Sequence, residues 1–240
     1  MNNKYKNFIP AAILLAFLLS AAAAYSQPIG NPAFLPERSW SIGFSGDQSE
    51  FDIEGNNYVS TRGLFKFNFS VNKTFKVSLI AGTANMRIYY PRSKYLSRLT
   101  SKNSLTLGGS GKFVFDIPKI KKISLFSEFG GMHFNPIGHT YSTLDDNQTD
   151  YYYHYDWREF WSTTGTIVKL YPYDIYVAYQ GRAIRQFEIF SRNEYYTGIF
   201  NCVIFGLDFH LPDNYLLNLQ VRALNGSAIT VGISQIALFK

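Results

Sequence analysis

The last 26 residues of the chain, 215–240, constrain its fold most strongly. Apolar residues occupy every second position of 217–223 and again of 229–233, and polar or small residues stand between them. Asn225-Gly226 separates these two segments, and this dipeptide favours a two-residue hairpin turn because both of its residues readily adopt positive φ. The stretch therefore predicts a C-terminal β-hairpin with one apolar face and one polar face.

The first 26 residues have the features of a secretory signal peptide. Lys4 and Lys6 form a basic start, residues 9–24 are largely apolar, and Ala24 and Ser26 place small residues before a cleavage site at Gln27. The apolar run is shorter than the roughly 20 residues that a spanning helix needs, although an uncleaved anchor is the alternative. We expect residues 1–26 to be removed on export and residues 27–240 to form one domain.

The alternation of the terminal hairpin recurs along the whole mature chain and predicts ten strands. Residues 27–38 contain three prolines and are expected to be a lead-in without a strand. Strands are predicted over 38–46, 58–71, 75–90, 105–117, 123–133, 157–171, 173–189 and 195–210, followed by the two halves of the terminal hairpin. The third is expected to contain a bulge near 84–86, where its alternation slips, and the sixth alternates least clearly.

The connections between these strands alternate in length. Residues 47–57, 91–103 and 134–156 are expected to be long loops, whereas 72–73, 118–122, 172 and 212–214 are short turns. Bacterial outer-membrane barrels have short periplasmic turns, longer outer loops and an even number of strands, and closure leaves no unpaired edge in lipid. The predicted fold is all-β: a closed antiparallel up-and-down transmembrane β-barrel of about ten strands, with eight or twelve as alternatives.

Composition and charge agree with this class. The chain has 21 Phe and 18 Tyr, and these rings alternate with polar residues and gather near strand ends, as in the aromatic girdles of membrane barrels. Without Lys4 and Lys6, 21 Lys and Arg face 17 Asp and Glu, a net charge of +4 that is too small to indicate a nucleic-acid partner. The single Cys202 excludes an internal disulfide.

Over its whole mature length the chain resembles the small bacterial outer-membrane β-barrel proteins, including those of the Bacteroidetes type. The signal peptide, the strand pattern and Phe239 carry this resemblance, although Lys240 follows the terminal aromatic residue that the barrel-assembly machinery reads in that group. The resemblance implies an outer-membrane location, with outer-membrane lipid, lipopolysaccharide and the assembly machinery as partners. Residues 30–33, Gly-Asn-Pro-Ala, are also similar to the Asn-Pro-Ala motif of fatty-acid-transporter-like barrels, with a plain Asn-Pro turn as the alternative.

Six charged residues fall on the polar, inward face of the predicted strands. Because a barrel of this width is largely filled by side chains, we expect them to form a network of ion pairs in the lumen. A narrow pathway lined by cations is the alternative. Glu128 has apolar neighbours in sequence, and Lys112 or Arg182 is its expected partner. The six residues are Lys66, Lys112, Glu128, Arg182, Asp208 and Arg222.

The densest group of aromatic residues begins within the 134–156 segment and continues into the following strand. We interpret it as part of the outer interfacial girdle. The alternative is a surface of exposed rings that binds a glycan or a partner protein. Its members are Tyr151, Tyr152, Tyr153, Tyr155, Trp157 and Trp161.

Histidine and aspartate residues gather in the same segment. Ten-stranded omptin proteases place such residues at the outer rim, where a carboxylate and a histidine can activate water, but the motifs of that family do not occur at matching positions. The spacing also lacks the close His or Cys pairs of a metal site. We therefore expect no catalytic residue, no metal and no cofactor. The residues are His133, His139, His154, Asp145, Asp146, Asp150 and Asp156.

Together these features predict an integral outer-membrane protein that is not an enzyme. Its expected role is structural or interactive, with the outer loops as the contact surface. A narrow channel or transporter for small solutes is the first alternative, and a rim-sited membrane hydrolase of the omptin type is the second.

Overall fold

The computed structural model describes residues 37, 39–53, 55–90, 98–118, 120, 122–144, 147–188, 194–224 and 227–238. The expected signal peptide, the lead-in apart from Glu37, the Asn225-Gly226 turn and Phe239 lie outside these ranges. The strands are β1 (Ser39–Ile53), β2 (Asn56–Ser70), β3 (Phe75–Tyr89), β4 (Arg98–Ser101), β5 (Ser104–Asp116), β6 (Ile123–Phe134), β7 (Ile137–Leu144), β8 (Asn147–Leu170), β9 (Tyr173–Glu188), β10 (Glu194–His210), β11 (Tyr215–Ala223) and β12 (Ala228–Leu238). Within the described part of the chain, no helix is long and apolar enough to cross a membrane.

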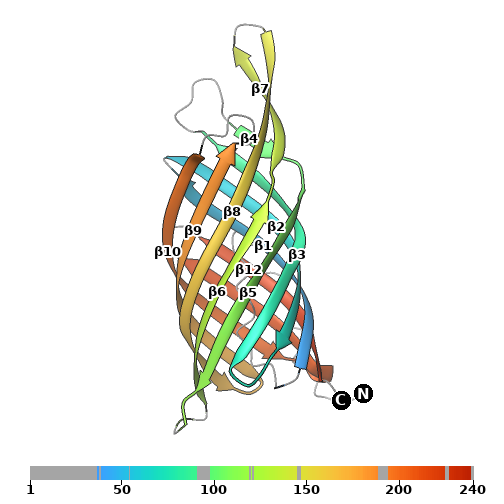
Figure 1. Ribbon diagram of the computed structural model, residues 1–240, viewed down its shortest axis with the longest axis vertical. Helices are drawn as coiled ribbons and strands as arrows, with labels where there is room; N and C mark the ends of the chain where they lie inside the picture. The colour runs from blue at the N-terminus through green and yellow to red at the C-terminus, as the bar shows by residue number, and fades with distance from the viewer. Residues whose placement is uncertain are drawn as a thin grey trace, which may run out of the picture.

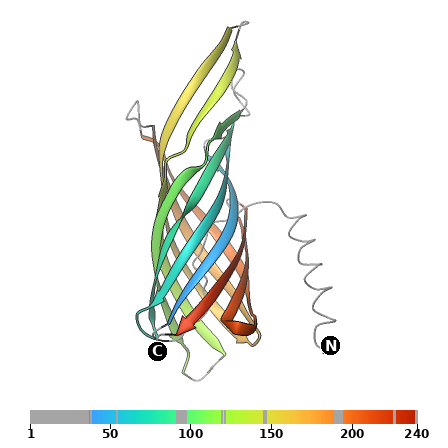
Figure 2. The same cartoon turned by 90° about the vertical axis from the view of Figure 1, so that its right-hand side faces the viewer.

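Ten of these strands close into a barrel (Figures 1 and 2). Going round the ring, β1, β2, β3, β5, β6, β8, β9, β10, β11 and β12 each pair antiparallel with the next, and β12 pairs with β1 from Ser39–Leu238 to Ser49–Ala228. The predicted closed antiparallel barrel of about ten strands is confirmed. Short turns such as 71–74 and 171–172 join the strands at the lower end in Figure 1, which is therefore the periplasmic end.

β4 and β7 continue β5 and β6 above a break in the wall. They pair with each other at Thr100–His139, and they also pair with β3 and β8, so the sheet stays closed above the break. The prediction of a bulge near 84–86 in β3 is wrong, because β3 pairs with β2 without interruption. The irregularity lies on the other side of β3, where its partner changes from β5 to β4. The alternation of apolar and polar residues is lost there in the sequence because Ala84 and Met86 are apolar residues that point inward.

The strands also extend higher than the sequence predicts. The expected loop over 47–57 is mostly strand, since β1 ends at Ile53 and β2 begins at Asn56. The expected loop over 134–156 contains β7 and the first part of β8, which pair from Ile137–His154 to Leu144–Asn147. This two-stranded arm projects well above the rim of the barrel (Figures 1 and 2).

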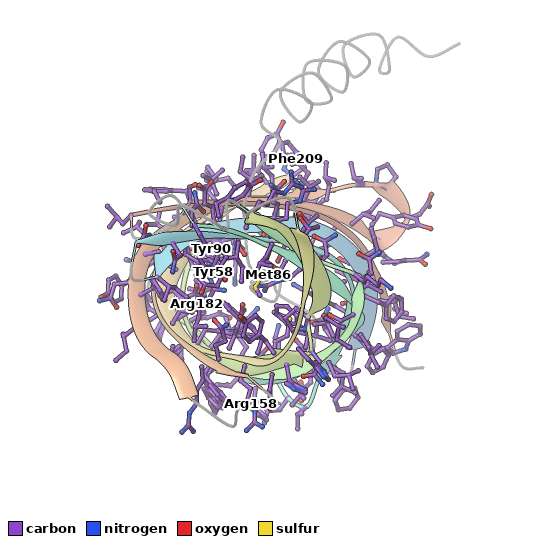
Figure 3. The ribbon with its side chains drawn as sticks, turned by 90° about the horizontal axis from the view of Figure 1, so that it is seen from above. Tyr58, Met86, Tyr90, Arg158, Arg182 and Phe209 are labelled. Atoms are coloured by element: carbon purple, nitrogen blue, oxygen red, sulfur yellow. The ribbon has the colours of Figure 1, made fainter. Side chains whose placement is uncertain are left out.

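The two faces of the barrel differ in polarity. Tyr58, Met86 and Arg182 point into the ring, whereas Arg158 and Phe209 lie outside it (Figure 3). An apolar exterior of this kind faces lipid in membrane barrels. The large apolar side chains exposed on the outer face include Phe44, Phe65, Leu79, Phe115, Phe129, Phe160, Val177, Phe205, Val221 and Ile233.

Candidate functional site

Glu159 on β8 is the centre of a charged layer buried in the lumen. Arg62 on β2 donates to both of its oxygens, with Nη1 3.0 Å from Oε2 and Nη2 2.6 Å from Oε1. Arg182 on β9 and Trp157 on β8 also donate to Oε1, at 2.6 and 2.7 Å. The side chains of Arg62 and Glu159 have no exposed surface. One carboxylate therefore links three strands through the interior of the barrel.

Further contacts hold the two arginines of this layer. Arg62 Nε lies 3.9 Å from Asp47 Oδ1, and its guanidinium carbon lies 5.3 Å from the centre of the Phe134 ring. Arg182 lies over the Phe51 ring at 4.9 Å. Contacts between a desolvated cation and a ring contribute roughly 2 kcal/mol each. The charged layer is thus joined directly to the aromatic residues above it.

An apolar layer fills the lumen immediately above these charges. Phe51 on β1 packs against Trp157 on β8 with ring centroids 5.6 Å apart, and it also contacts Tyr58 and Phe200 at 5.8 and 5.9 Å. β1 and β8 are five strands apart in both directions around the ring, so side chains from opposite walls meet here. The other buried members of the layer are Ile53, Ala84, Met86, Ile88, Leu99, Phe134 and Ile184.

A second polar layer lies lower in the lumen. Lys112 and Glu128 stand directly opposite each other in the β5–β6 register, and Lys112 Nζ is 3.1 Å from Glu128 Oε2, so the expected pair is present. Tyr176 Oη donates to Gln220 Oε1 at 3.1 Å and accepts from Asn218 Nδ2 at 3.1 Å. These bonds cross-link β5 to β6 and β9 to β11.

All six residues predicted to line the lumen are buried on the inward face: Lys66, Lys112, Glu128, Arg182, Asp208 and Arg222. The structure brings Lys112 to Glu128, whereas Arg182 binds Glu159 and Asp208 accepts a hydrogen bond from Asn218. Asp47, Arg62 and Glu159 are not among the six. The strand period could have found Arg62, because it lies four residues from Lys66 and therefore on the same face.

The interpretation of the aromatic group as a girdle or loop surface needs correction. Trp157 and Trp161 point into the lumen, where they are 0% and 4% exposed, and Tyr155 packs against the apolar layer. These rings therefore pack against other side chains inside the upper barrel rather than against lipid. The side chains of Tyr151, Tyr152 and Tyr153 lie outside the described part of the structure.

One histidine and one aspartate from the 133–156 region meet on the outer face of the wall. His133 Nε2 lies 2.9 Å from Asp156 Oδ1, and Arg158 Nη2 lies 2.6 Å from Asp156 Oδ2. Asp145 and Asp146, and the side chains of His139 and Asp150, lie outside the described part. Among the side chains that are described, no group of three or more His, Cys, Asp or Glu could hold a metal ion.

No protein-family model matches the sequence, and no curated protein matches it. The structure is similar to the β-domain of the Bordetella autotransporter BrkA, with a TM-score of 0.53 and 10% identity over 82% of this chain and 97% of that chain. An outer membrane channel from Pseudomonas putida F1 (TM-score 0.46, 8% identity, 88% and 100% covered) and the outer membrane protease OmpT from Escherichia coli (0.45, 6%, 87% and 99%) have lower scores.

This chain is an outer-membrane β-barrel. Ring closure, the apolar exterior and the likeness to the autotransporter domain agree on that fold. Because a closed barrel with such an exterior is stable only across lipid, its place is the outer membrane. Neither the specific role of the barrel nor its Bacteroidetes type follows from these likenesses, and both stay predictions.

Proposed function

We propose that this outer-membrane barrel has a structural or interaction role, is not an enzyme, and works with its lumen closed. The contact between Phe51 and Trp157 carries the proposal, because it joins opposite walls of the barrel. The Glu159 layer directly below supports it, since opening a path there would separate a buried carboxylate from two guanidinium groups. Function is then carried by the surfaces of the barrel rather than by passage through it.

The arm formed by β7 and β8 is the proposed contact surface. Its two strands pair with each other up to Leu144–Asn147, whereas the ladder to β4 ends at His139 and the ladder to β9 ends at Tyr155. Backbone groups along such outer edges are templates for an added strand of another chain. We propose that a protein partner pairs with one of these edges, and a glycan that contacts the tyrosines of the arm is the alternative.

Site-specific photocrosslinking in whole cells tests this role. A photoreactive residue at Thr143, in the arm, should give a discrete adduct with a partner protein. A photoreactive residue at Leu170, at the lower end of β8, should give no such adduct. A barrel lacking residues 139–152 should still show the faster migration of a folded barrel on unboiled gels. It should no longer bind the protein that is crosslinked through Thr143. If Thr143 gives no adduct, the arm is not a contact surface.

Two substitutions on the outer wall address the hydrolase alternative. If whole cells cleaved an added peptide, and if His133→Ala and Asp156→Asn each abolished this cleavage, the protein would be an enzyme and the proposal would be wrong. We expect no such cleavage, because the omptin motifs do not occur at matching positions and Arg158 also binds the Asp156 carboxylate.

A further inference from the structure

A hollow of about 700 Å³ opens on the outer wall beside the break between β6 and β7. Leu105, Leu107 and Ile137 contribute apolar lining, and Lys102, His133 and Asn135 contribute polar lining. The volume lies within the range of roughly 300–1,000 Å³ that is usual for sites that bind small ligands. The hollow is separate from the closed lumen, so its function need not involve passage through the barrel.

The hollow arises because two strand breaks face each other. β5 and β6 pair up to Thr106–Phe134, and pairing resumes in β4 and β7 at Ser101–Gly138. Between these points the wall is held by the bond from the Lys102 amide to the Ile137 carbonyl, at 2.8 Å. Asn135 Oδ1 is buried in this gap without a hydrogen-bond partner among the described residues. An ordered water or a donor from a ligand can satisfy a buried acceptor of this kind.

The wall changes from apolar to basic across the hollow. Leu105 and Leu107 are 67% and 52% exposed and continue the apolar exterior formed by Leu79 and Phe160. Lys102 and His133 line the other part of the hollow. His154 also lines the hollow, and Arg87, Arg98 and Arg158 are further basic residues on the strands around it. Among the described side chains, the acidic Asp156 is bound to His133 and Arg158.

We propose that this hollow binds one anionic lipid of the outer leaflet whose headgroup carries a phosphate monoester. An acyl chain lies against Leu105 and Leu107, and the phosphate accepts a hydrogen bond from Lys102, beside His133, whose Nε2 is held by Asp156. Charge complementarity selects an anionic lipid, because the surface is basic at the level where headgroups meet the apolar belt.

Native mass spectrometry of the purified full-length barrel tests the site, with lipid A, dephosphorylated lipid A and phosphatidylcholine as separate probes. We expect one lipid A molecule per barrel to survive detergent exchange, and about tenfold less retention of the two lipids that lack a phosphate monoester. Equal retention of lipid A and its dephosphorylated form would overturn the proposal.

Variants locate the binding and separate a lipid site from a simple anion site. Lys102→Gln combined with His133→Gln should reduce lipid A retention about tenfold, whereas Lys102→Arg should preserve it. Lys73→Gln, at an exposed lysine in the periplasmic turn, is the matched control and should change nothing. Leu107→Ser should weaken retention of lipid A without changing any binding of inorganic phosphate.

Three outcomes would contradict the proposal. The first is a loss of lipid A retention in Lys73→Gln equal to that in the Lys102 and His133 double variant, which would mean a general effect of charge. The second is unchanged retention in the Lys102 and His133 double variant, and the third is full displacement of lipid A by inorganic phosphate, which would indicate a site for a free anion. Gel mobility without boiling verifies that each variant remains a folded barrel.

Discussion

Phe51 and Trp157 stand on opposite walls of the barrel, and their ring centroids are 5.6 Å apart. Directly below them, one carboxylate, that of Glu159, is shared by Arg62 and Arg182. Interiors of barrels with about this number of strands are normally filled by side chains. The lumen is therefore crossed by an apolar layer and a charged layer, and each layer has measurable consequences.

Replacing Glu159 by Gln should destabilise the barrel by about 3–5 kcal/mol, because it leaves two buried guanidinium groups without their shared negative charge. Urea-induced unfolding in lipid vesicles measures this change. The control is Glu37→Gln, which removes a solvent-exposed pair with Lys73 at 3.9 Å and should cost less than about 1 kcal/mol. Equal costs for the two variants would show that the buried charges contribute no more than a surface pair.

Lys112 and Glu128 should be energetically coupled. Glu128→Gln alone leaves a buried lysine poorly compensated, and Lys112→Met alone leaves a buried carboxylate in the same state. The double variant should therefore recover part of the loss, with an interaction free energy of about 1 kcal/mol or more. Strictly additive unfolding free energies would mean that the two side chains do not act as a pair.

Gly206 on β10 should not tolerate a methyl group. A Cβ at this position would lie 1.7 Å from Cζ of Tyr176, whose ring is buried and whose hydroxyl bonds Asn218 and Gln220. Gly206→Ala should therefore destabilise the barrel by about 1–3 kcal/mol. Gly46→Ala is the control, since a Cβ there meets nothing within 4 Å. A neutral Gly206→Ala would show that the ring of Tyr176 moves freely.

The cost of a charge on the outer face should depend on depth in the membrane. Leu79 is 62% exposed near the middle of the outer face of β3, and Thr83 lies on the same face nearer the upper rim. Leu79→Arg should cost about 2–4 kcal/mol if the membrane is centred there, whereas Thr83→Arg should cost at most about 1 kcal/mol. Unfolding in vesicles measures both costs. A larger cost for Thr83→Arg than for Leu79→Arg would place the middle of the membrane nearer the upper rim.

The strands were predictable because the outer face is apolar on every strand and period-two alternation follows from that. Alternation fails where the inward face is apolar too. In β8 the inward positions include Trp157, Trp161 and Ile167, so this strand alternates poorly in sequence although it is regular in the structure. The same cause led to the wrong prediction of a bulge in β3 and made Trp157 and Trp161 resemble an interfacial girdle.

Contacts across the lumen were only partly predictable. Lys112 and Glu128 lie on consecutive strands joined by a short turn, so their register could be estimated from the sequence. Arg62 and Glu159 are 97 residues apart on strands that are not neighbours, and their meeting depends on ring size and strand tilt. The hollow beside Asn135 depends on two breaks that coincide in space, which strand periodicity does not record.

Single-channel conductance of the unmodified protein in a planar lipid bilayer tests the closed lumen most directly. The contact of Phe51 with Trp157 and the layer around Glu159 predict no resolved open-channel steps at moderate voltage. Phe51→Ala combined with Trp157→Ala removes only the apolar layer and should still show no such steps, because Arg62, Glu159 and Arg182 continue to cross the lumen. Stable, large conductance steps in the unmodified protein would contradict the account and would favour a channel instead.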